Sequence, residues 1–104
     1  MVSISLCMIV RNEEKVLGRC LACVQGFADE IIIVDTGSTD RTKEIAFSFT
    51  DKVYDFKWKD DFAAARNFAF SRGTGDYLFW LDADDVIRQE EWRKLMDLKR
   101  RLDM

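Results

Sequence analysis

The chain has 104 residues, of which 48% are hydrophobic and 34% charged, and a formal net charge of −3; this is the size and composition of one small globular domain. Because the chain has no histidine, Ser-His-Asp and Cys-His nucleophilic systems are excluded, and its chemistry must rest on carboxylates. The acidic balance gives no basic surface for nucleic acid. With no apolar run near the ~20 residues that span a bilayer, we expect a cytoplasmic protein, free or peripheral to the inner face of the membrane.

Apolar runs and helical patterns alternate along the whole chain. In chain order we expect a strand at residues 3–10, a helix at 12–26, a strand at 31–35, a helix at 41–49, a strand at 52–56, a helix at 62–71, a strand at 76–82 and a helix at 89–102. Asn12, followed by two glutamates, is the predicted start of the first helix, because it is a capping residue followed by first-turn acids.

Strands that alternate with helices at this pitch are typical of right-handed βαβ crossovers. We therefore predict an α/β fold over residues 1–104, with a Rossmann-like, mainly parallel sheet of about four strands and helices on both faces. The strand at 52–56 is short, which favours an edge position. The strand at 76–82 is apolar on both faces, which is typical of the centre of a sheet.

Cys20 and Cys23 form a C-x-x-C motif inside the first predicted helix. A redox pair needs the N-terminus of a helix, where the dipole activates the thiol. A four-ligand zinc site needs further partners, and Cys7 is the only other cysteine. We therefore expect ordinary core cysteines.

Polar clusters follow three of the four predicted strands. They are Arg11-Asn12-Glu13, Asp35-Thr36-Gly37-Ser38 and Asp82-Ala83-Asp84-Asp85. Ligands of parallel sheets bind beyond the carboxyl ends of the strands, so these clusters should share one rim. The carboxylates of the third cluster repel one another unless a cation lies between them, and Mg²⁺ and Mn²⁺ prefer such oxygen ligands. An acidic turn that caps the last helix and stays solvated accounts for the same residues.

Other carboxylate motifs fit the third cluster less well. An EF-hand loop counted from Asp82 has Arg93 where a bidentate glutamate is required, and the chain has neither a G-x-G-x-x-G nor a P-loop motif. The stronger rival is the pattern of haloacid-dehalogenase-like phosphatases, an apolar strand followed by D-x-D-x-V at Asp82 to Val86. In that alternative Asp82 is the nucleophile and Asp84 the acid.

Four segments of the chain match one family pattern in order. They are Ile4 to Glu13, Ile32 to Asp40, Phe62 to Asn67 and Phe79 to Asp85. Together they resemble the N-terminal, nucleotide-sugar-binding half of family 2 glycosyltransferases with the GT-A fold, and the likeness covers almost the whole chain. It implies a truncated GT-A fold with strand order 3-2-1-4.

The resemblance also implies roles for particular residues. Asp35 would hold the nucleotide base, Val10 to Glu13 would line the nucleoside pocket, Arg66 would face it, and Asp82 would contact the ribose. The implied nucleotide-binding residues are thus Val10, Arg11, Glu13, Asp35, Arg66 and Asp82, and the implied ligands of a Mn²⁺ or Mg²⁺ ion are Asp82 and Asp84. The implied donor is a UDP-sugar in preference to a GDP-sugar. Two plainer interpretations stay open: Arg66 as a surface residue and Asp35 as a helix cap.

In this family the sugar is transferred by inverting displacement to a saccharide, lipid or peptide acceptor. A second half supplies the acceptor site and the general base, and nineteen positions follow Asp85, so no catalytic base is assigned in this chain. Strand order 3-2-1-4 would leave the strand at 76–82 at an exposed edge, which predicts self-association through this fourth strand. The alternative outside enzymes is a non-catalytic structural or assembly module.

Overall fold

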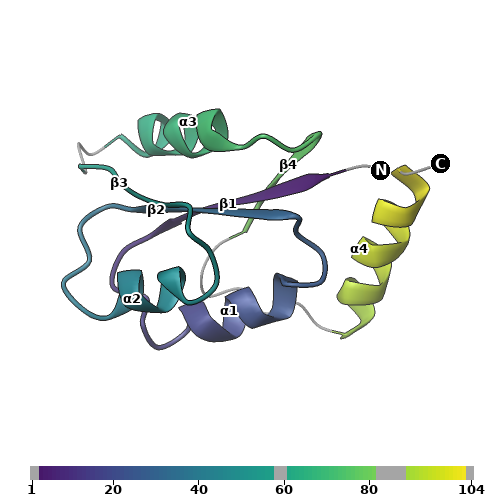
Figure 1. Cartoon of the computed structure of the whole chain (residues 1–104), viewed down its shortest axis with the longest axis horizontal. Helices are drawn as coiled ribbons and strands as arrows, with labels where there is room; N and C mark the ends of the chain where they lie inside the picture. Colours follow the sequence, from purple (N-terminus) through teal and green to yellow (C-terminus); the bar gives the residue numbers. More distant parts are fainter. Residues whose placement is uncertain (1–2, 58–60, 82–88, 103–104) are drawn as a thin grey trace.

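Strands and helices alternate throughout the described part of the chain (Figure 1). The computed structural model describes residues 3–57, 61–81 and 89–102. The elements are β1 (Ile4–Val10), α1 (Leu17–Val24), β2 (Glu30–Asp35), α2 (Thr42–Phe47), β3 (Val53–Asp55), α3 (Phe62–Arg72), β4 (Tyr77–Trp80) and α4 (Gln89–Leu102). Each predicted strand and helix is present, and the largest difference lies at the start of α1.

The four described strands form one parallel sheet in the order β3-β2-β1-β4. This confirms the predicted fold class and strand order. The register between β1 and β2 runs from Ser5 opposite Glu30 to Val10 opposite Asp35, so the two central strands end level with each other. Asp35 is in turn opposite Asp55, the last residue of β3. Three strand ends therefore meet at one edge of the sheet, called the carboxyl edge below.

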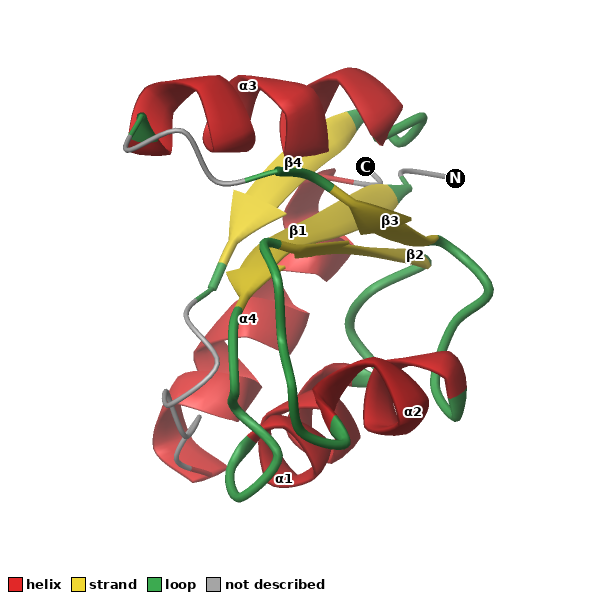
Figure 2. Cartoon of the chain, turned by 90° about the vertical axis from the view of Figure 1, so that its left-hand side faces the viewer, coloured by secondary structure: helices red, strands yellow, loops and turns green. Residues whose placement is uncertain are grey.

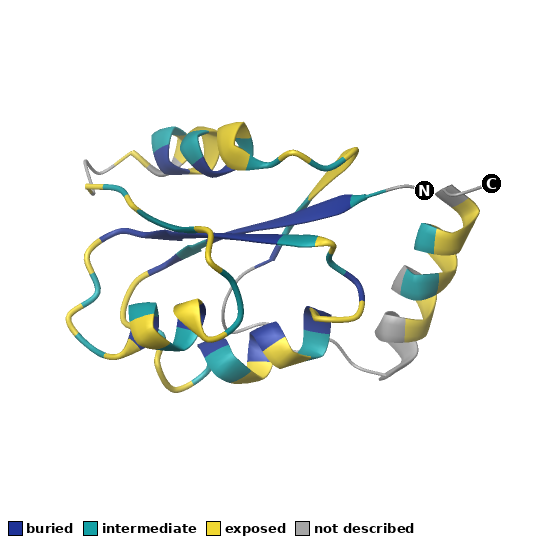
Figure 3. Ribbon diagram, in the orientation of Figure 1, coloured by how far each residue is buried: buried dark blue, intermediate teal, exposed yellow. Residues whose placement is uncertain are grey.

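Helices cover both faces of the sheet, with α1 and α2 on one face and α3 on the other (Figure 1). The central strands are buried along almost their whole length (Figure 3). The core on the α1 and α2 face contains Leu6, Met8, Val10, Leu17, Cys20, Leu21, Val24, Ile31, Ile33, Ala46 and Leu81. The smaller core under α3 contains Cys7, Ile32, Val34 and Ala69. Burial on both faces explains why β1 and β2 are almost continuously apolar.

The apolar pattern of β4 indicated a central strand, whereas the implied order 3-2-1-4 predicted an edge strand. In the structure β4 is at the edge of the described sheet, so the prediction from strand order is confirmed. Tyr77 is 47% exposed and Leu78 is 46% exposed. A pattern that is apolar on both faces thus occurs on a strand whose outer side pairs with no described strand.

The first helix begins at Leu17 and not at Asn12, which corrects the predicted start. Asn12 has a φ of 52° and its side-chain oxygen accepts a hydrogen bond from the backbone of Thr39. A residue in that left-handed conformation, with its cap atom already occupied, does not start a helix. In α1, Cys20 is buried and Cys23 half-buried, and neither forms a disulfide.

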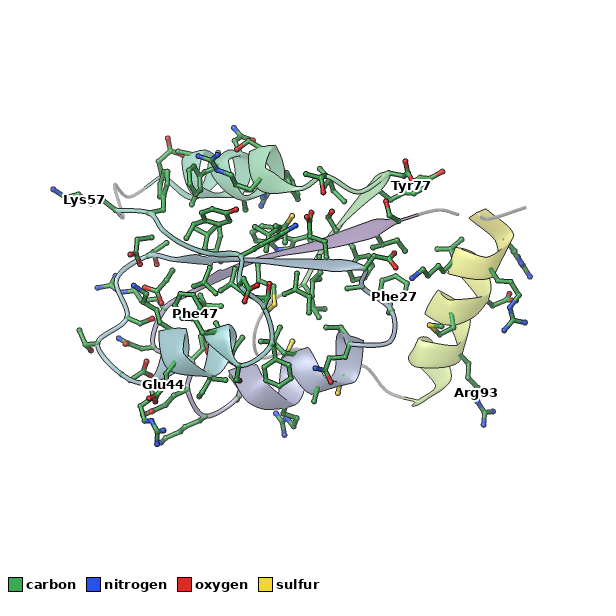
Figure 4. All side chains as sticks on the ribbon, in the orientation of Figure 1. Phe27, Glu44, Phe47, Lys57, Tyr77 and Arg93 are labelled. Carbon is green, nitrogen blue, oxygen red and sulfur yellow. The ribbon has the colours of Figure 1, made fainter. Side chains whose placement is uncertain are left out.

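The last helix, α4, lies beyond the amino ends of the strands, beside the loop between α1 and β2 (Figure 1). Lys99 Nζ donates hydrogen bonds to the Phe27 carbonyl at 2.8 Å and to Asp29 Oδ1 at 3.2 Å. Figure 4 shows Phe27 on the side of the domain that faces α4. None of the described helices is both long and apolar enough to cross a membrane.

Candidate functional site

The β1–α1 and β2–α2 loops leave the carboxyl edge side by side (Figure 2). Thr36 N donates to the Val10 carbonyl at 3.1 Å, where the two strands end. Further out, Asn12 N donates to Ser38 Oγ at 2.9 Å and Glu13 N donates to Thr42 Oγ1 at 2.8 Å. The structure therefore brings the first two predicted polar clusters into direct contact at one rim, while the third cluster lies outside the described residues.

Asp35 is the buried acid of this edge and is 2% exposed. Its Oδ1 accepts hydrogen bonds from Gly37 N at 2.9 Å and from Ser38 N at 2.8 Å. Gly37 has a φ of 117°, a conformation that favours glycine, and so the turn can fold back over the carboxylate. Among the described residues, Asp35 Oδ2 is the buried side-chain oxygen or nitrogen without a partner. Such an atom in a native fold needs an explanation, and a bound ligand is one.

A pocket of about 310 Å³ adjoins Asp35. It is lined by Asp35, Thr36, Gly37, Asp55, Phe56 and Lys57. Figure 4 shows Lys57 projecting from this end of the molecule. The pocket combines an aromatic wall, a cation and carboxylates, which suits a planar polar ring attached to an anionic group.

Residues near the end of β3 also belong to this edge, although the sequence analysis did not include them. Lys43 of α2 forms an ion pair with Asp55 at 2.8 Å. The hydrogen bond that Lys43 donates to Asp55, together with the negative charges of Asp55 and Asp35, raises the pKa of Lys43 above its usual value, against the opposing effect of burial. The rule that ligands bind at carboxyl ends would have identified Asp55, Phe56 and Lys57, had it been applied to the weakest strand as well.

The predicted residues of the first cluster occupy different environments. The Val10 side chain is buried in the core of the α1 and α2 face, so Val10 reaches the edge through its backbone. Arg11 is exposed at the start of the loop. Glu13 is half-buried, and its carbonyl accepts hydrogen bonds from Val16 N and Leu17 N just before α1.

Arg66 lies on α3, across the sheet from the loops that follow β1 and β2. Its guanidinium carbon is 5.4 Å from the centroid of the Trp80 ring, and Trp80 is the last residue of β4. Asp82 and Asp84 lie outside the described residues. Because Trp80 ends β4, Arg66 lies near the end of the strand that leads to these two aspartates.

Metal-ligating side chains do not cluster in threes within residues 3–57, 61–81 and 89–102. The predicted metal ligands are in the stretch after β4, which the structure does not describe. The described residues show the direction of β4, which points toward the same edge of the sheet as β1 and β2.

A larger pocket of about 520 Å³ opens at the opposite, amino end of the sheet, between the ends of α1 and α2. Its walls include Asp29, Glu30, Phe47, Asp51 and Lys52. The Asp29 and Glu30 carboxylates already have protein partners, Lys99 and Lys52. Size alone therefore does not locate the site, and the carboxyl edge is preferred because it has an unpartnered buried acid.

The family model for glycosyl transferase family 2 matches residues 5–103 of the chain. The match thus includes all four strands and extends through the acidic cluster to the last helix.

Two curated relatives are similar over almost the whole chain. A TPR repeat-containing protein of Synechococcus elongatus is 50% identical over 95 residues, which cover 91% of this chain and 24% of the relative. The SPbeta prophage-derived glycosyltransferase SunS of Bacillus subtilis is 35% identical over 99 residues, which cover 92% of this chain and 23% of SunS. The chain thus spans about a quarter of the length of these relatives.

Solved structures share the fold at lower identity. S. aureus TarS 1–349 in complex with UDP has a TM-score of 0.75 at 22% identity, over 97% of this chain and 32% of TarS. M. tuberculosis glucosyl-3-phosphoglycerate synthase in complex with Mg²⁺ and UDP has a TM-score of 0.70 at 22% identity, over 82% of this chain and 34% of the synthase. At this identity the likeness shows the fold alone.

Proposed function

The chain belongs to glycosyl transferase family 2, and on that premise we propose that it binds a nucleotide-sugar donor at the carboxyl edge of its sheet. The observation that carries the proposal is the Asp35 carboxylate, whose Oδ2 is buried without a partner beside a pocket of about 310 Å³. A hydrogen bond from a ligand N–H would satisfy this oxygen and recover the cost of burying it.

A nucleobase supplies that donor. Uracil presents one ring N–H, which can donate to Asp35 Oδ2, while Oδ1 stays with Gly37 N and Ser38 N. The pocket also offers Phe56 as a flat apolar wall. UDP in the complexes of TarS and glucosyl-3-phosphoglycerate synthase supports uridine as the first choice, and guanosine, which also has a ring N–H, as the second.

The other family positions surround the same edge. Val10, Arg11 and Glu13 are proposed to border the nucleoside, since their loop is hydrogen-bonded to the turn that holds Asp35. Arg66 is proposed to face the donor from α3, near the end of β4. Its positive charge suits a diphosphate.

Asp82 and Asp84 are proposed to hold a Mn²⁺ or Mg²⁺ ion, with Asp82 also contacting the ribose. The donor set fits, because both metals favour carboxylate oxygens and commonly share phosphate ligands. When bound, such an ion would neutralise the diphosphate and stabilise it as a leaving group. The direction of β4 toward the carboxyl edge supports this placement.

The reaction proposed for the whole protein is sugar transfer by inverting displacement to a saccharide, lipid or peptide acceptor. The residues of this chain would bind and orient the donor. The general base and the acceptor site are assigned to no residue among the 104.

Isothermal titration of the chain with UDP, GDP and ADP, each with and without Mn²⁺, tests the donor site. We expect UDP to bind most tightly, Mn²⁺ to strengthen binding, and both Asp35→Asn and Asp84→Ala to weaken it tenfold or more. Asp51→Asn is the matched control for Asp35→Asn, because Asp51 is exposed at the opposite edge. If no nucleotide binds, or if Asp51→Asn weakens binding as much as Asp35→Asn, the donor-site proposal is wrong.

The two alternatives differ from this proposal in the same assays. A haloacid-dehalogenase-like phosphatase using Asp82 as nucleophile would release phosphate from p-nitrophenyl phosphate with Mg²⁺. A non-catalytic structural module would neither hydrolyse that ester nor bind a nucleotide.

We also propose that the isolated chain self-associates through β4, with a second copy as the occupant of its outer edge. The support is the exposure of Tyr77 and Leu78 on a strand whose outer side pairs with no described residue. Light scattering should show dimers that increase with concentration, and Leu78→Lys should reduce them. A monomer at every concentration would exclude this pairing.

A further inference from the structure

Asn12 has an unusual backbone conformation at the candidate site. Within the described ranges it is the one residue other than glycine with a positive φ, at 52°. A left-handed conformation is costly for most L-residues and is tolerated best by glycine and asparagine. Asn12 adopts this conformation although the sequence Asn12-Glu13-Glu14 is typical of a helix start. Other contacts must therefore stabilise it.

Those contacts all go to the neighbouring loop. Asn12 N donates to Ser38 Oγ at 2.9 Å, and Asn12 Oδ1 accepts from Thr39 N at 2.8 Å and from Thr39 Oγ1 at 3.4 Å. The left-handed backbone thus lets both the amide and the side chain of one residue bind the turn that follows β2.

The same turn holds the acid of the proposed site. Ser38, which accepts from Asn12 N, donates its own backbone N–H to Asp35 Oδ1 at 2.8 Å. Asn12 is therefore one residue removed from the Asp35 carboxylate, and its chain neighbours are Arg11 and Glu13. It connects the two halves of the proposed nucleotide pocket.

A second connection between the loops does not use the Asn12 side chain. Glu13 N donates to Thr42 Oγ1 at 2.8 Å and Glu14 N donates to Asp40 Oδ2 at 3.3 Å. These bonds join the loops near the start of α2. Without the Asn12 side chain the loops would stay joined there. The turn over Asp35 would lose the hydrogen bonds that Thr39 donates to Asn12 Oδ1.

We propose that Asn12 is a positioning residue for the nucleotide: through Ser38 and Thr39 it fixes the 36–39 turn so that Asp35 Oδ2 faces the base. This inference rests on the proposed donor site and adds to it a residue that does not itself contact the ligand. Its loss should weaken nucleotide binding much more than it destabilises the free chain.

Three substitutions separate the backbone from the side chain. Asn12→Asp keeps both the Oδ1 acceptor and tolerance of positive φ. Asn12→Gly keeps the backbone conformation and removes the acceptor, and Asn12→Ala removes the acceptor and disfavours the conformation. Thr74→Ala is the control of matched size, because it removes a hydroxyl that donates to Glu30 Oε2 at the opposite edge of the sheet.

The measurements are the UDP dissociation constant with Mn²⁺, the melting temperature, and the amide exchange rate of Thr39 in the free chain. We expect Asn12→Gly to raise the dissociation constant at least tenfold and to accelerate Thr39 exchange at least tenfold. Asn12→Asp should stay within threefold of the wild type in both measurements. Thr74→Ala should lower the melting temperature at least as much as Asn12→Gly does, without changing UDP affinity.

Each outcome distinguishes a failure of the positioning role of Asn12 from a failure of the donor site. If the wild type binds UDP and Asn12→Gly binds it equally well, the positioning role is wrong and the donor site stands. The same conclusion follows if UDP affinity decreases in Thr74→Ala as much as in Asn12→Gly, since the effect then tracks stability. If the wild type binds no UDP, the donor site is wrong and the positioning role is overturned with it, whatever the Thr39 exchange rate.

Discussion

The central strand β2 begins with the half-buried Glu30 and ends with the buried Asp35, and the chain supplies different hydrogen-bond partners to the two carboxylates. The Glu30 side chain, 8% exposed, accepts hydrogen bonds from Ser5 Oγ at 2.7 Å, Thr74 N at 2.8 Å and Thr74 Oγ1 at 2.9 Å, and pairs with Lys52. Asp35, 2% exposed, receives two backbone N–H groups on Oδ1 and none on Oδ2. One carboxylate is fully satisfied within the chain and the other is not.

This difference separates a structural acid, Glu30, from the acid that is proposed to bind the nucleotide, Asp35. Burial alone would raise the pKa of Glu30, but hydrogen bonds from Lys52, Thr74 and Ser5 outweigh it and lower the pKa from 4.5 to about 2. The folded chain therefore stabilises the charged form of Glu30. Asp35 keeps one oxygen available, which is what a site needs if the ligand is to supply the last hydrogen bond.

The largest expected effect is at Glu30. In Glu30→Gln one oxygen becomes an NH2 group, which is itself a donor. It has to face either Lys52 or Thr74 N–H, and both of these are donors too. We expect the free energy of unfolding to decrease by about 3 kcal/mol, because several hydrogen bonds to a charged carboxylate whose side chain is 8% exposed are lost together. Urea unfolding measures this loss, and titration of the variant that remains folded should show UDP affinity within twofold of the wild type.

Glu44→Gln is the control for that substitution. Glu44 pairs with Arg41 at 2.5 Å on the surface, where both side chains are mostly exposed, so its loss should cost less than about 0.5 kcal/mol. If the two variants lose equal stability, Glu30 is not the structural acid described above.

Acid should reproduce most of the Glu30 effect. Because the pKa of Glu30 is about 2 in the folded chain and 4.5 ordinarily, its stabilisation is complete above pH 4.5 and is lost as the pH falls toward 2. Between pH 6 and pH 3 this group alone should remove about 2 kcal/mol from the free energy of unfolding. Urea unfolding across that range should give a shallower decrease in Glu30→Gln than in the wild type, and parallel curves would contradict the assignment.

The sheet could be predicted from the sequence because its signals are local. The apolar runs of β1 and β2 and the helical patterns between them each extend over a few adjacent residues, and their alternation predicts parallel crossovers. The order 3-2-1-4 was implied by the family resemblance and not by these local patterns. The position of β4 could not be judged in this way. Its pattern reflects how apolar the strand is and not whether another strand lies beside it.

The contacts of the site depend on residues far apart in the sequence. Asn12 resembles a helix cap in its local pattern, and only the approach of Thr39, 27 residues later, assigns it another role. Glu30 showed no sign of burial, because its partners Ser5 and Thr74 lie 25 residues before it and 44 after it. The unpartnered oxygen of Asp35 is likewise a property of the folded turn.

A smaller effect on stability is expected at Asp35. In Asp35→Asn the carbonyl can still accept from Gly37 N and Ser38 N, and removing a buried charge whose Oδ2 has no partner offsets the weaker hydrogen bonds. The free energy of unfolding should change by less than about 1 kcal/mol, while UDP affinity decreases at least tenfold. Thermal melting measures the change in stability, and titration measures the change in UDP affinity. A loss of stability as large as that of Glu30→Gln would show that Asp35 is a structural acid too.

The smallest effect on stability is expected at Lys43, where a change in UDP affinity can be separated from a change in stability on the carboxyl edge itself. Its ion pair with Asp55 is partly exposed, with 40% of the Lys43 side chain and 71% of the Asp55 side chain accessible. Lys43→Gln should therefore leave the free energy of unfolding almost unchanged, and the small difference from the wild type should vanish in high salt. Because Asp55 lines the pocket, the variant leaves an unbalanced negative charge there, which should weaken the binding of anionic UDP twofold to fivefold at low salt. Titration at low and high salt measures this, and a loss of affinity that is the same at both salt concentrations would contradict the electrostatic role of Lys43.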